Sequence, residues 1–426
     1  MKKLITLIVA AIMAVACCFG LTACGAKEKA VALICLHGDD SSYDKNFIDA
    51  FKAACEAKGL SKEQYTIVTG IPEEGDDCYN KAAGFADAGY KAVFADSFGH
   101  EANMVKAAKA FPNVLFCHAT GTKSSLSLDE DATNDTPANF HNAFASIYEG
   151  RYLAGVAAGL KLVELYGDEN GNVADENAKV GYVGAHPYAE VVSGYTSWFL
   201  GIKSIVPNVR MEVRYTYSWF SINGEKATAL ALIENGCKLI SGHADSMGVP
   251  TACKEKNIPN VFYNGTHEND QFIIASKINW QPYFEKMIDA ALNGTELPKD
   301  FTGTLSDGSV QITALGKCAA AGTAEKLAEV KTKILNKEIK IFDVSAFTVN
   351  AAKADTSEFS KASYITMDEN GHLTAYNADV IDYGDFVGET NVIDGGQFCE
   401  SKFRSAPYFD IIIDGITIGA DVEYTD

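Results

Sequence analysis

Residues 31–58, VALICLHGDDSSYDKNFIDAFKAACEAK, place a short apolar run before a polar loop and then a helical pattern. Two further units of the same kind begin at YTIVTG (65–70) and KAVFAD (91–96). Short continuous apolar runs are typical of strands buried on both faces, and helices of ten or more residues supply the crossovers between parallel strands. Residues 31–111 therefore predict a parallel α/β sheet.

A second series of strand-like runs follows, at KVGYVG (179–184), VRMEVRYTYSW (209–219) and CKLISGHA (237–244), each with a helical pattern behind it. Between the two series we predict one long helix over residues 142–165. The fold class is therefore α/β, with two doubly wound lobes. Facing lobes of this kind bring the carboxyl ends of their strands, where ligands usually bind, to the two sides of a hinged cleft.

The lobe boundaries follow from this order of elements. We expect lobe 1 to hold residues 31–142 and part of 266–310, and lobe 2 to hold residues 143–265 and part of 311–426. Residues 343–426 carry sixteen acidic and four basic side chains. We interpret them as an acidic, β-rich extension with a hairpin at Asp368–Gly371, where Asn370 and Gly371 favour a type I′ turn.

The first residues have the pattern of an export signal. Lys2 and Lys3 precede an apolar run that is short for a membrane span, and LTAC closes it at Cys24. The ending resembles a bacterial lipoprotein cleavage site, so we expect a signal peptide over 1–23, lipid attachment at Cys24 and a tether over 24–30. An ordinary cleaved signal is the alternative. Either interpretation predicts an extracytoplasmic protein, and the first one holds it at the cell membrane.

Composition and the absence of known motifs narrow the classes of function that the protein can have. The 426 residues contain 36 basic and 56 acidic side chains, a net charge of −20, which repels phosphate backbones and argues against nucleic-acid binding. The chain contains no GxSxG, GxxxxGK[ST], HExxH or post-strand GxGxxG motif, so we predict no enzyme activity, no cofactor and no metal. After the predicted signal peptide, eight cysteines besides Cys24 allow disulfides. None of them has the CxxC spacing of a metal site, and several lie in apolar runs that suit free thiols.

Aromatic and acidic residues recur where predicted strands end, and this recurrence favours a binding site. An aromatic ring offers a flat face to a heterocycle, and carboxylates accept from hydroxyl or amine groups, so the pattern predicts a nucleoside-like ligand. Each residue taken singly has a structural alternative, as a packing aromatic or a helix N-cap. The candidate ligand-binding residues are Asp40, Ser42, Tyr43, Asp44, Ser97, Phe98, Asn142, Trp219, Phe220, Asp245, Glu268, Asn279 and Trp280.

Several blocks resemble the basic membrane protein family of substrate-binding lipoproteins, of the purine nucleoside receptor type. The blocks occur in the family's order from about residue 30 to 317, and the most specific is YEGRYLAGVAAGL at 148. The others include DDSSYD at 39, ADSFG at 95, KVGYVGAHPYAEVVSGY at 179, SWFSINGEKATALALIENG at 218, HADS at 243 and INWQPYFEKMIDAALNG at 278. The resemblance implies a type I periplasmic-binding-protein fold. It also implies capture of a purine nucleoside or purine base for the permease and ATPase of an ABC importer.

The resemblance also assigns roles within the cleft. Tyr43 matches the position that faces the base, and Trp219 with Phe220 match the opposite stacking position. Asp40 and Asp44 belong to the loop of Tyr43, Asp245 and Glu268 match acidic positions of the second lobe, and Asn279 with Trp280 match the late cleft strand.

Two other functions remain open on the sequence. A lipid-anchored sensor or surface adhesion protein would keep the fold without a transport role. A nucleoside-acting enzyme would use Asp40 and Asp44 to bind a metal. We expect the protein to act as a monomer.

Overall fold

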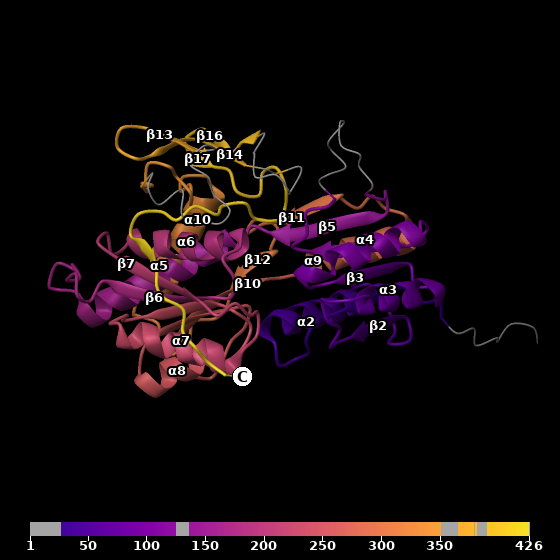
Figure 1. Ribbon diagram of the computed structural model, residues 1–426, viewed down its shortest axis with the longest axis horizontal. Helices are drawn as coiled ribbons and strands as arrows, with labels where there is room; N and C mark the ends of the chain where they lie inside the picture. Colours follow the sequence, from indigo (N-terminus) through magenta and orange to yellow (C-terminus); the bar gives the residue numbers. More distant parts are fainter. Residues whose placement is uncertain (1–26, 125–135, 351–364, 379, 381–389, 426) are drawn as a thin grey trace, which may run out of the picture.

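The computed structural model describes residues 27–124, 136–350, 365–378, 380 and 390–425. Within them the chain forms two α/β lobes that lie side by side (Figure 1). This confirms the predicted fold class. The predicted signal peptide and Cys24 lie outside the described residues.

The first lobe is built on a six-stranded sheet in which every neighbouring pair is parallel. Its order is β11-β5-β4-β3-β1-β2. The strands are β1 (Val31–Ile34), β2 (Tyr65–Val68), β3 (Ala92–Ala95), β4 (Leu115–Ala119), β5 (Phe140–Ala145) and β11 (Asp300–Gly303). The helices are α2 (Ser42–Ala57), α3 (Asp77–Asp87), the 3-10 turn η1 (Phe98–His100), α4 (Glu101–Ala110) and α9 (Gln281–Asn293).

The second lobe is built on a seven-stranded sheet of order β12-β10-β9-β8-β6-β7-β18, in which β12 is antiparallel to β10. Its strands are β6 (Lys179–Gly184), β7 (Arg210–Tyr215), β8 (Ile240–His243), β9 (Asn260–Tyr263), β10 (Phe272–Ile278), β12 (Val310–Ile312) and β18 (Ile416–Ile418). Its helices are α5 (Tyr148–Tyr166), α6 (Ala189–Lys203), α7 (Ile222–Glu234), α8 (Gly248–Lys256) and α10 (Thr323–Leu335).

Within the described residues, the chain crosses between the two sheets three times. The crossings are residues 146–147 between β5 and α5, residues 279–280 between β10 and α9, and residues 304–309 between β11 and β12. The boundary that we expected after residue 142 falls inside β5, whose residues 142–145 pair with β11. Three short links leave the lobes connected along one side, which permits hinge closure.

The predicted helix over 142–165 was wrong at its start. Phe140–Ala145 is the strand β5, held between β4 and β11, and the helix begins at Tyr148. The alanine-rich sequence FHNAFASIYEGRYLAG suits a helix by propensity, but burial between two parallel neighbours makes the first part a strand.

The C-terminal region packs on the second lobe. Figure 1 shows its small strands gathered with α10 above α5 and α6, and β18 extends the second sheet parallel to β7. The small strands are β13 (Ile365–Met367), β14 (Leu373–Ala378), β15 (Thr390–Asn391), β16 (Ile393–Asp394) and β17 (Gln397–Phe398). The predicted hairpin is present between β13 and β14. Its type I′ turn was wrong, because Gly371 has a positive φ of 87° and Asn370 does not, whereas type I′ needs both.

The helices α5 and α6 make the closest helix contact of the second lobe, and glycines allow it. A Cβ atom at Gly155 would lie 2.1 Å from the Trp198 carbonyl oxygen, and one at Gly201 would lie 2.2 Å from the Tyr152 carbonyl oxygen. Both distances are far below van der Waals contact, so the two backbones can touch only where neither residue has a side chain. Gly155 belongs to the block YEGRYLAGVAAGL, whose glycines therefore have a packing role.

We predict that Gly155→Ala lowers the free energy of unfolding by about 1–3 kcal/mol, because the methyl group must push α6 away from α5. Urea unfolding followed by circular dichroism measures this. The matched control is Gly84→Ala in α3, where nothing lies within 4 Å of the added methyl group and the helix should gain roughly 0.5–1 kcal/mol. Equal stability of the two variants would contradict the close contact.

A second prediction concerns Glu400, which is buried in the C-terminal region and accepts a hydrogen bond from the Tyr408 backbone N–H at 3.4 Å. Burial raises its pKa from 4.5 to about 8. Between these values the native state binds more protons than the unfolded chain, so this group makes stability fall as the pH rises from about 5 to 8. Glu400→Gln should flatten that fall, measured as the melting temperature against pH. The control Glu369→Gln, at an exposed turn, should leave the profile unchanged.

Candidate functional site

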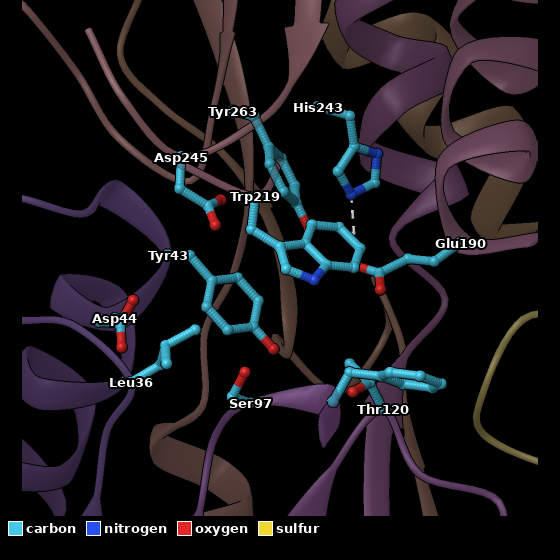
Figure 2. A pocket seen from close by; sticks show the side chains of 11 residues that line it. Leu36, Tyr43, Asp44, Ser97, Thr120, Glu190, Trp219, His243, Asp245 and Tyr263 are labelled. Carbon is cyan, nitrogen blue, oxygen red and sulfur yellow. Dashed lines mark hydrogen bonds and ion pairs between the residues drawn. The ribbon is translucent and has the colours of Figure 1, made fainter. Parts of the chain in front are cut away.

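A pocket of about 390 Å³ lies between the lobes, at the carboxyl ends of strands from both sheets. The first lobe lines it with Leu36, Tyr43, Asp44, Ser97, Phe98 and Thr120. The second lobe lines it with Glu190, Trp219, His243, Asp245 and Tyr263. Figure 2 shows the Tyr43 ring and the Trp219 indole reaching into the middle of this space from different lobes. It lies at the edge of the sheets where ligands of open α/β folds usually bind.

Local capping places the first-lobe residues. Ser41 is the N-cap of α2, and its hydroxyl oxygen accepts from the Asp44 backbone N–H at 3.1 Å. The Asp44 carboxylate in turn accepts from the Ser41 hydroxyl at 2.6 Å and from the His37 backbone N–H at 2.7 Å. This reciprocal cap fixes the first turn of α2 and presents Tyr43 and Asp44 to the pocket.

Tyr43 is held by a hydrogen bond beneath the pocket. Its hydroxyl donates to the Asp96 backbone carbonyl at 2.9 Å, and burial raises its pKa well above the usual value. The ring is therefore neutral and its edge is anchored to the end of β3. An anchored neutral ring is a suitable flat surface for another ring.

A small cluster of buried polar groups lies behind Tyr43. Potential ligand atoms of Cys35, Asp44 and Asp96 lie within 4.8 Å of one another. Burial, reinforced by the neighbouring carboxylates, raises the pKa of the Cys35 thiol and of the Asp96 carboxyl well above their usual values. These shifts favour the protonated, uncharged forms of the thiol and of the carboxyl.

The second lobe contributes a histidine–carboxylate pair. His243 Nε2 lies 3.3 Å from Glu190 Oε1 (Figure 2). Burial, followed by the charge of Arg151, lowers the pKa of His243 to about 4. The imidazole is therefore neutral at physiological pH and donates from Nε2 to the carboxylate, which leaves the Glu190 oxygens as acceptors for a ligand.

Arg151 packs against Tyr263 and is hydrogen-bonded to the strand that carries His243. It is fully buried at the start of α5, its guanidinium carbon lies 3.8 Å from the centre of the Tyr263 ring, and its Nη1 donates to the Gly242 carbonyl at 3.2 Å. A guanidinium stacked on a ring holds that ring in one orientation. The arginine of the block YEGRYLAGV thus orders Tyr263 and the strand end that carries His243.

Trp219 belongs to an aromatic group at the mouth of the pocket. Its ring centre lies 5.0 Å from that of His186 and 6.0 Å from that of Tyr188, and Tyr188 lies 5.8 Å from Phe98 across the cleft. The Asp245 backbone N–H donates to the Trp219 carbonyl at 2.9 Å, which ties the loops after β7 and β8 together. These contacts give the indole a defined position before any ligand binds.

Carboxyl groups crowd the pocket. Burial raises the pKa of Asp245 well above its usual value, and the charges of Asp44, Glu225 and Glu190 add to this effect. Nearby, burial raises the pKa of Glu225 to about 7. The raised pKa favours the protonated form of Asp245, which donates as well as accepts hydrogen bonds, while the carboxylates of Asp44 and Glu190 disfavour an anionic ligand.

The structure brings six of the predicted residues into this pocket: Tyr43, Asp44, Ser97, Phe98, Trp219 and Asp245. Asp40 and Ser42 line an adjoining groove of about 840 Å³, which shares Asp245 with the pocket. The Ser42 backbone N–H donates to the Asp245 carbonyl at 3.0 Å, so this loop forms the partition between the two spaces and a direct contact between the lobes.

The structure places the other five away from the pocket. Asn142 is buried within β5, where its side chain accepts from the Ser124 backbone N–H, and Asn279 donates to the Gly308 carbonyl at an interlobe crossing. Phe220 packs on His37 with ring centres 5.3 Å apart, while Glu268 is exposed on the loop after β9. Trp280 is a core residue of the first lobe.

Trp280 shows that an aromatic residue at the end of a strand need not line the cleft. Its ring stacks on Phe47 at 4.3 Å and it is only 2% exposed. The indole turns inward because the chain has just crossed to the first lobe, where α9 and α2 pack together and need a large apolar side chain between them.

Five lining residues were not among the candidates: Leu36, Thr120, Glu190, His243 and Tyr263. Each lies at or just after the carboxyl end of a strand, or at the start of the following helix. Ligands of parallel sheets bind at these positions, so the sequence criterion that gave the other candidates applies to these residues as well. A second space of about 450 Å³ adjoins the pocket and includes Arg404, Ala406 and Pro407 from the C-terminal region. No motif marks those residues in the sequence.

Two further observations concern cysteines and membranes. All eight cysteines of the described residues are free thiols. Over the same residues, none of the helices combines the length and the apolar character that a membrane crossing needs.

Comparisons with known proteins agree with this geometry. The profile of the Bmp family, described as the PnrA-like ABC-transporter substrate-binding proteins, matches residues 27–345. A purine-binding protein from Brucella abortus is 31% identical over 317 residues, which cover 74% of this chain and 81% of that protein. An ABC-transporter glucose-binding protein by name, from Haloferax volcanii, is 26% identical over 266 residues, 62% of each chain.

Solved structures show the same fold. A solute-binding protein of an ABC transporter from Aeropyrum pernix superposes with a TM-score of 0.57 at 16% identity, over 73% of this chain and 92% of that one. A second one, from Conexibacter woesei, gives a TM-score of 0.55 at 18% identity, over 73% and 97% of the two chains. The family match over most of the chain, its two lobes and its interlobe pocket lead to one conclusion: the chain belongs to the Bmp family of PnrA-like ABC-transporter substrate-binding proteins.

Proposed function

We propose that this substrate-binding protein captures a purine nucleoside or purine base between its lobes and delivers it to the permease and ATPase of an ABC importer. The observation that carries the proposal is the pair Tyr43 and Trp219, which extend into one pocket from opposite lobes. The 31% identical Brucella relative, named as purine-binding, supports the ligand class. We further propose that the protein binds its ligand unchanged and is not an enzyme.

The chemistry of the pocket suits a purine. A heterocycle is able to stack on the two rings, while its N–H groups and any ribose hydroxyls donate to the oxygens of Asp44, Glu190 and Asp245. The carboxylates of Asp44 and Glu190 disfavour phosphate, so a nucleoside or base fits better than a nucleotide. Glucose also carries hydroxyl donors, and the name of the Haloferax relative makes it the competing ligand to test.

Closure of the lobes is the proposed means of capture. Contacts between the lobes, such as Ser42 N–H to the Asp245 carbonyl and Asn46 Nδ2 to Asn264 Oδ1 at 3.5 Å, join α2 to loops of the second lobe. A ligand that touches both lobes binds the closed arrangement better than an open one and shifts the population toward it. The closed form then presents both lobes to the permease. A sensor on the same fold would bind equally well, and transport of labelled purine by cells that lack the protein separates the two roles.

We predict that the protein binds purines and that Trp219→Ala weakens binding roughly tenfold or more, since removal of a stacking ring costs about 1–3 kcal/mol per base. Isothermal titration calorimetry on protein refolded without ligand measures the dissociation constants for adenosine, inosine, adenine, hypoxanthine and glucose. The matched control is Phe220→Ala, which removes the neighbouring aromatic ring that packs on His37, and it should change affinity less than threefold. Binding of glucose but of no purine would refute the assignment.

A separate prediction concerns the proposed lipid tether at Cys24, which lies outside the described residues. Cys24→Ser should prevent acylation and release the protein from the cell membrane into the medium or periplasm. Fractionation followed by immunoblotting, with metabolic labelling by a fatty acid, measures this. Cys399→Ser, at a free and partly exposed thiol, is the control and should leave the protein with the membrane. Unchanged membrane association of Cys24→Ser would contradict the tether.

A further inference from the structure

The C-terminal region contributes to the ligand cleft, although the family match ends at residue 345. We call residues 399–409 the strap. Its Ser405 backbone N–H donates to Asp300 Oδ2 of β11 in the first lobe at 2.7 Å. On the second-lobe side, the Glu400 carbonyl accepts from the Tyr148 hydroxyl of α5 at 3.5 Å, and Phe409 stacks on Phe342 at 4.5 Å. The strap is thus fixed to both lobes beside the hinge.

The strap forms one wall of a compartment of about 450 Å³. This compartment adjoins the main pocket, because Phe98, Thr120, Glu190 and Trp219 line both spaces. Arg404, Ala406 and Pro407 of the strap lie on its far side, with Tyr188 at the start of α6. The strap is therefore separated from a ligand in the main pocket by no more than these shared side chains.

Arg404 lines the compartment, but most of its side chain is withdrawn from solvent. This side chain is 5% exposed, and its Nε and Nη2 donate to the carbonyls of Ala406 and Pro407, each at 3.1 Å. The guanidinium thus closes the turn of its own segment. What remains toward the compartment is mainly the rings of Phe98, Tyr188 and Trp219 with the small side chains of the strap.

Charge and hydrogen bonding together favour an uncharged group over an anion in the same space. Glu190 lines the compartment as well as the pocket, and the whole chain carries a net charge of −20. A phosphate would face this carboxylate, while the Arg404 guanidinium is committed to carbonyls of the strap. An apolar or aromatic group, in contrast, would bury its surface against three rings and a proline.

We propose that the strap compartment holds an uncharged apolar or aromatic substituent of the ligand, so that this protein takes substituted purines in addition to plain ones. The inference rests on the proposed purine function and extends it to a ligand class that the strap selects. A segment outside the family match thereby becomes part of the specificity of the site.

The test compares three probes by isothermal titration calorimetry: adenosine, N6-benzyladenosine and 5′-deoxy-5′-benzylthioadenosine, which carry the ring on the base or on the sugar. We expect at least one benzyl compound to bind as tightly as adenosine or more tightly. Pro407→Trp, which fills the compartment from the strap, should weaken that compound at least tenfold and adenosine less than threefold. Lys402→Trp, at an exposed strap position, is the matched control and should change neither.

A second variant keeps the test independent of the fold of the strap. Ala189→Leu enlarges a lining side chain at the start of α6, outside the strap, and should weaken the benzyl compound at least fivefold while adenosine stays within threefold. The proposal is overturned if adenosine binds and neither benzyl compound does, or if the variants weaken all probes equally. If no purine binds at all, the proposed function itself fails, and this inference fails with it.

Discussion

The whole arrangement depends on the parallel pairing of strands within each sheet. Parallel strands all end at the same edge, so every loop that follows a strand in one lobe faces the loops of the other lobe across the cleft. Tyr43 after β1, Trp219 after β7 and Asp245 after β8 meet for this reason, although up to about two hundred residues separate them along the chain. The three short crossings then hold the two edges opposite each other.

The pocket combines rigid apolar surfaces with carboxyl groups that are costly to bury. Asp44 is satisfied by the loop that caps α2, and Glu190 accepts from a neutral His243. Arg151, stacked on Tyr263, supplies the positive charge that helps to keep that histidine neutral. The polar groups are therefore ordered before a ligand arrives, which reduces the entropy that binding must overcome. The block YEGRYLAGV therefore contains an arginine that fixes side chains of the pocket, in addition to the glycines that allow α5 and α6 to pack.

Local sequence predicted much of the fold and about half of the residues that line the interlobe pocket. The strand runs at 31, 65, 91 and 179 are short and apolar, so periodicity identified them. β5 was missed because its six residues are compatible with a helix and only β4 and β11 make them a strand. Trp280 and Asn142 were assigned to the cleft for a related reason: the sequence places a residue at a strand or helix end, but packing decides whether its side chain turns to the core or to the ligand.

By itself the sequence determined the α/β class, the acidic character and the loops that carry aromatic and acidic side chains, because these depend on composition and on patterns within a few residues. Tertiary structure alone decided which side chains share one pocket, where the chain crosses between lobes, and that the strap joins the cleft. Arg404 lies about three hundred residues from Phe98 along the chain, yet both line one compartment. Such proximity arises from the packing of two lobes and a C-terminal segment, and no local pattern encodes it.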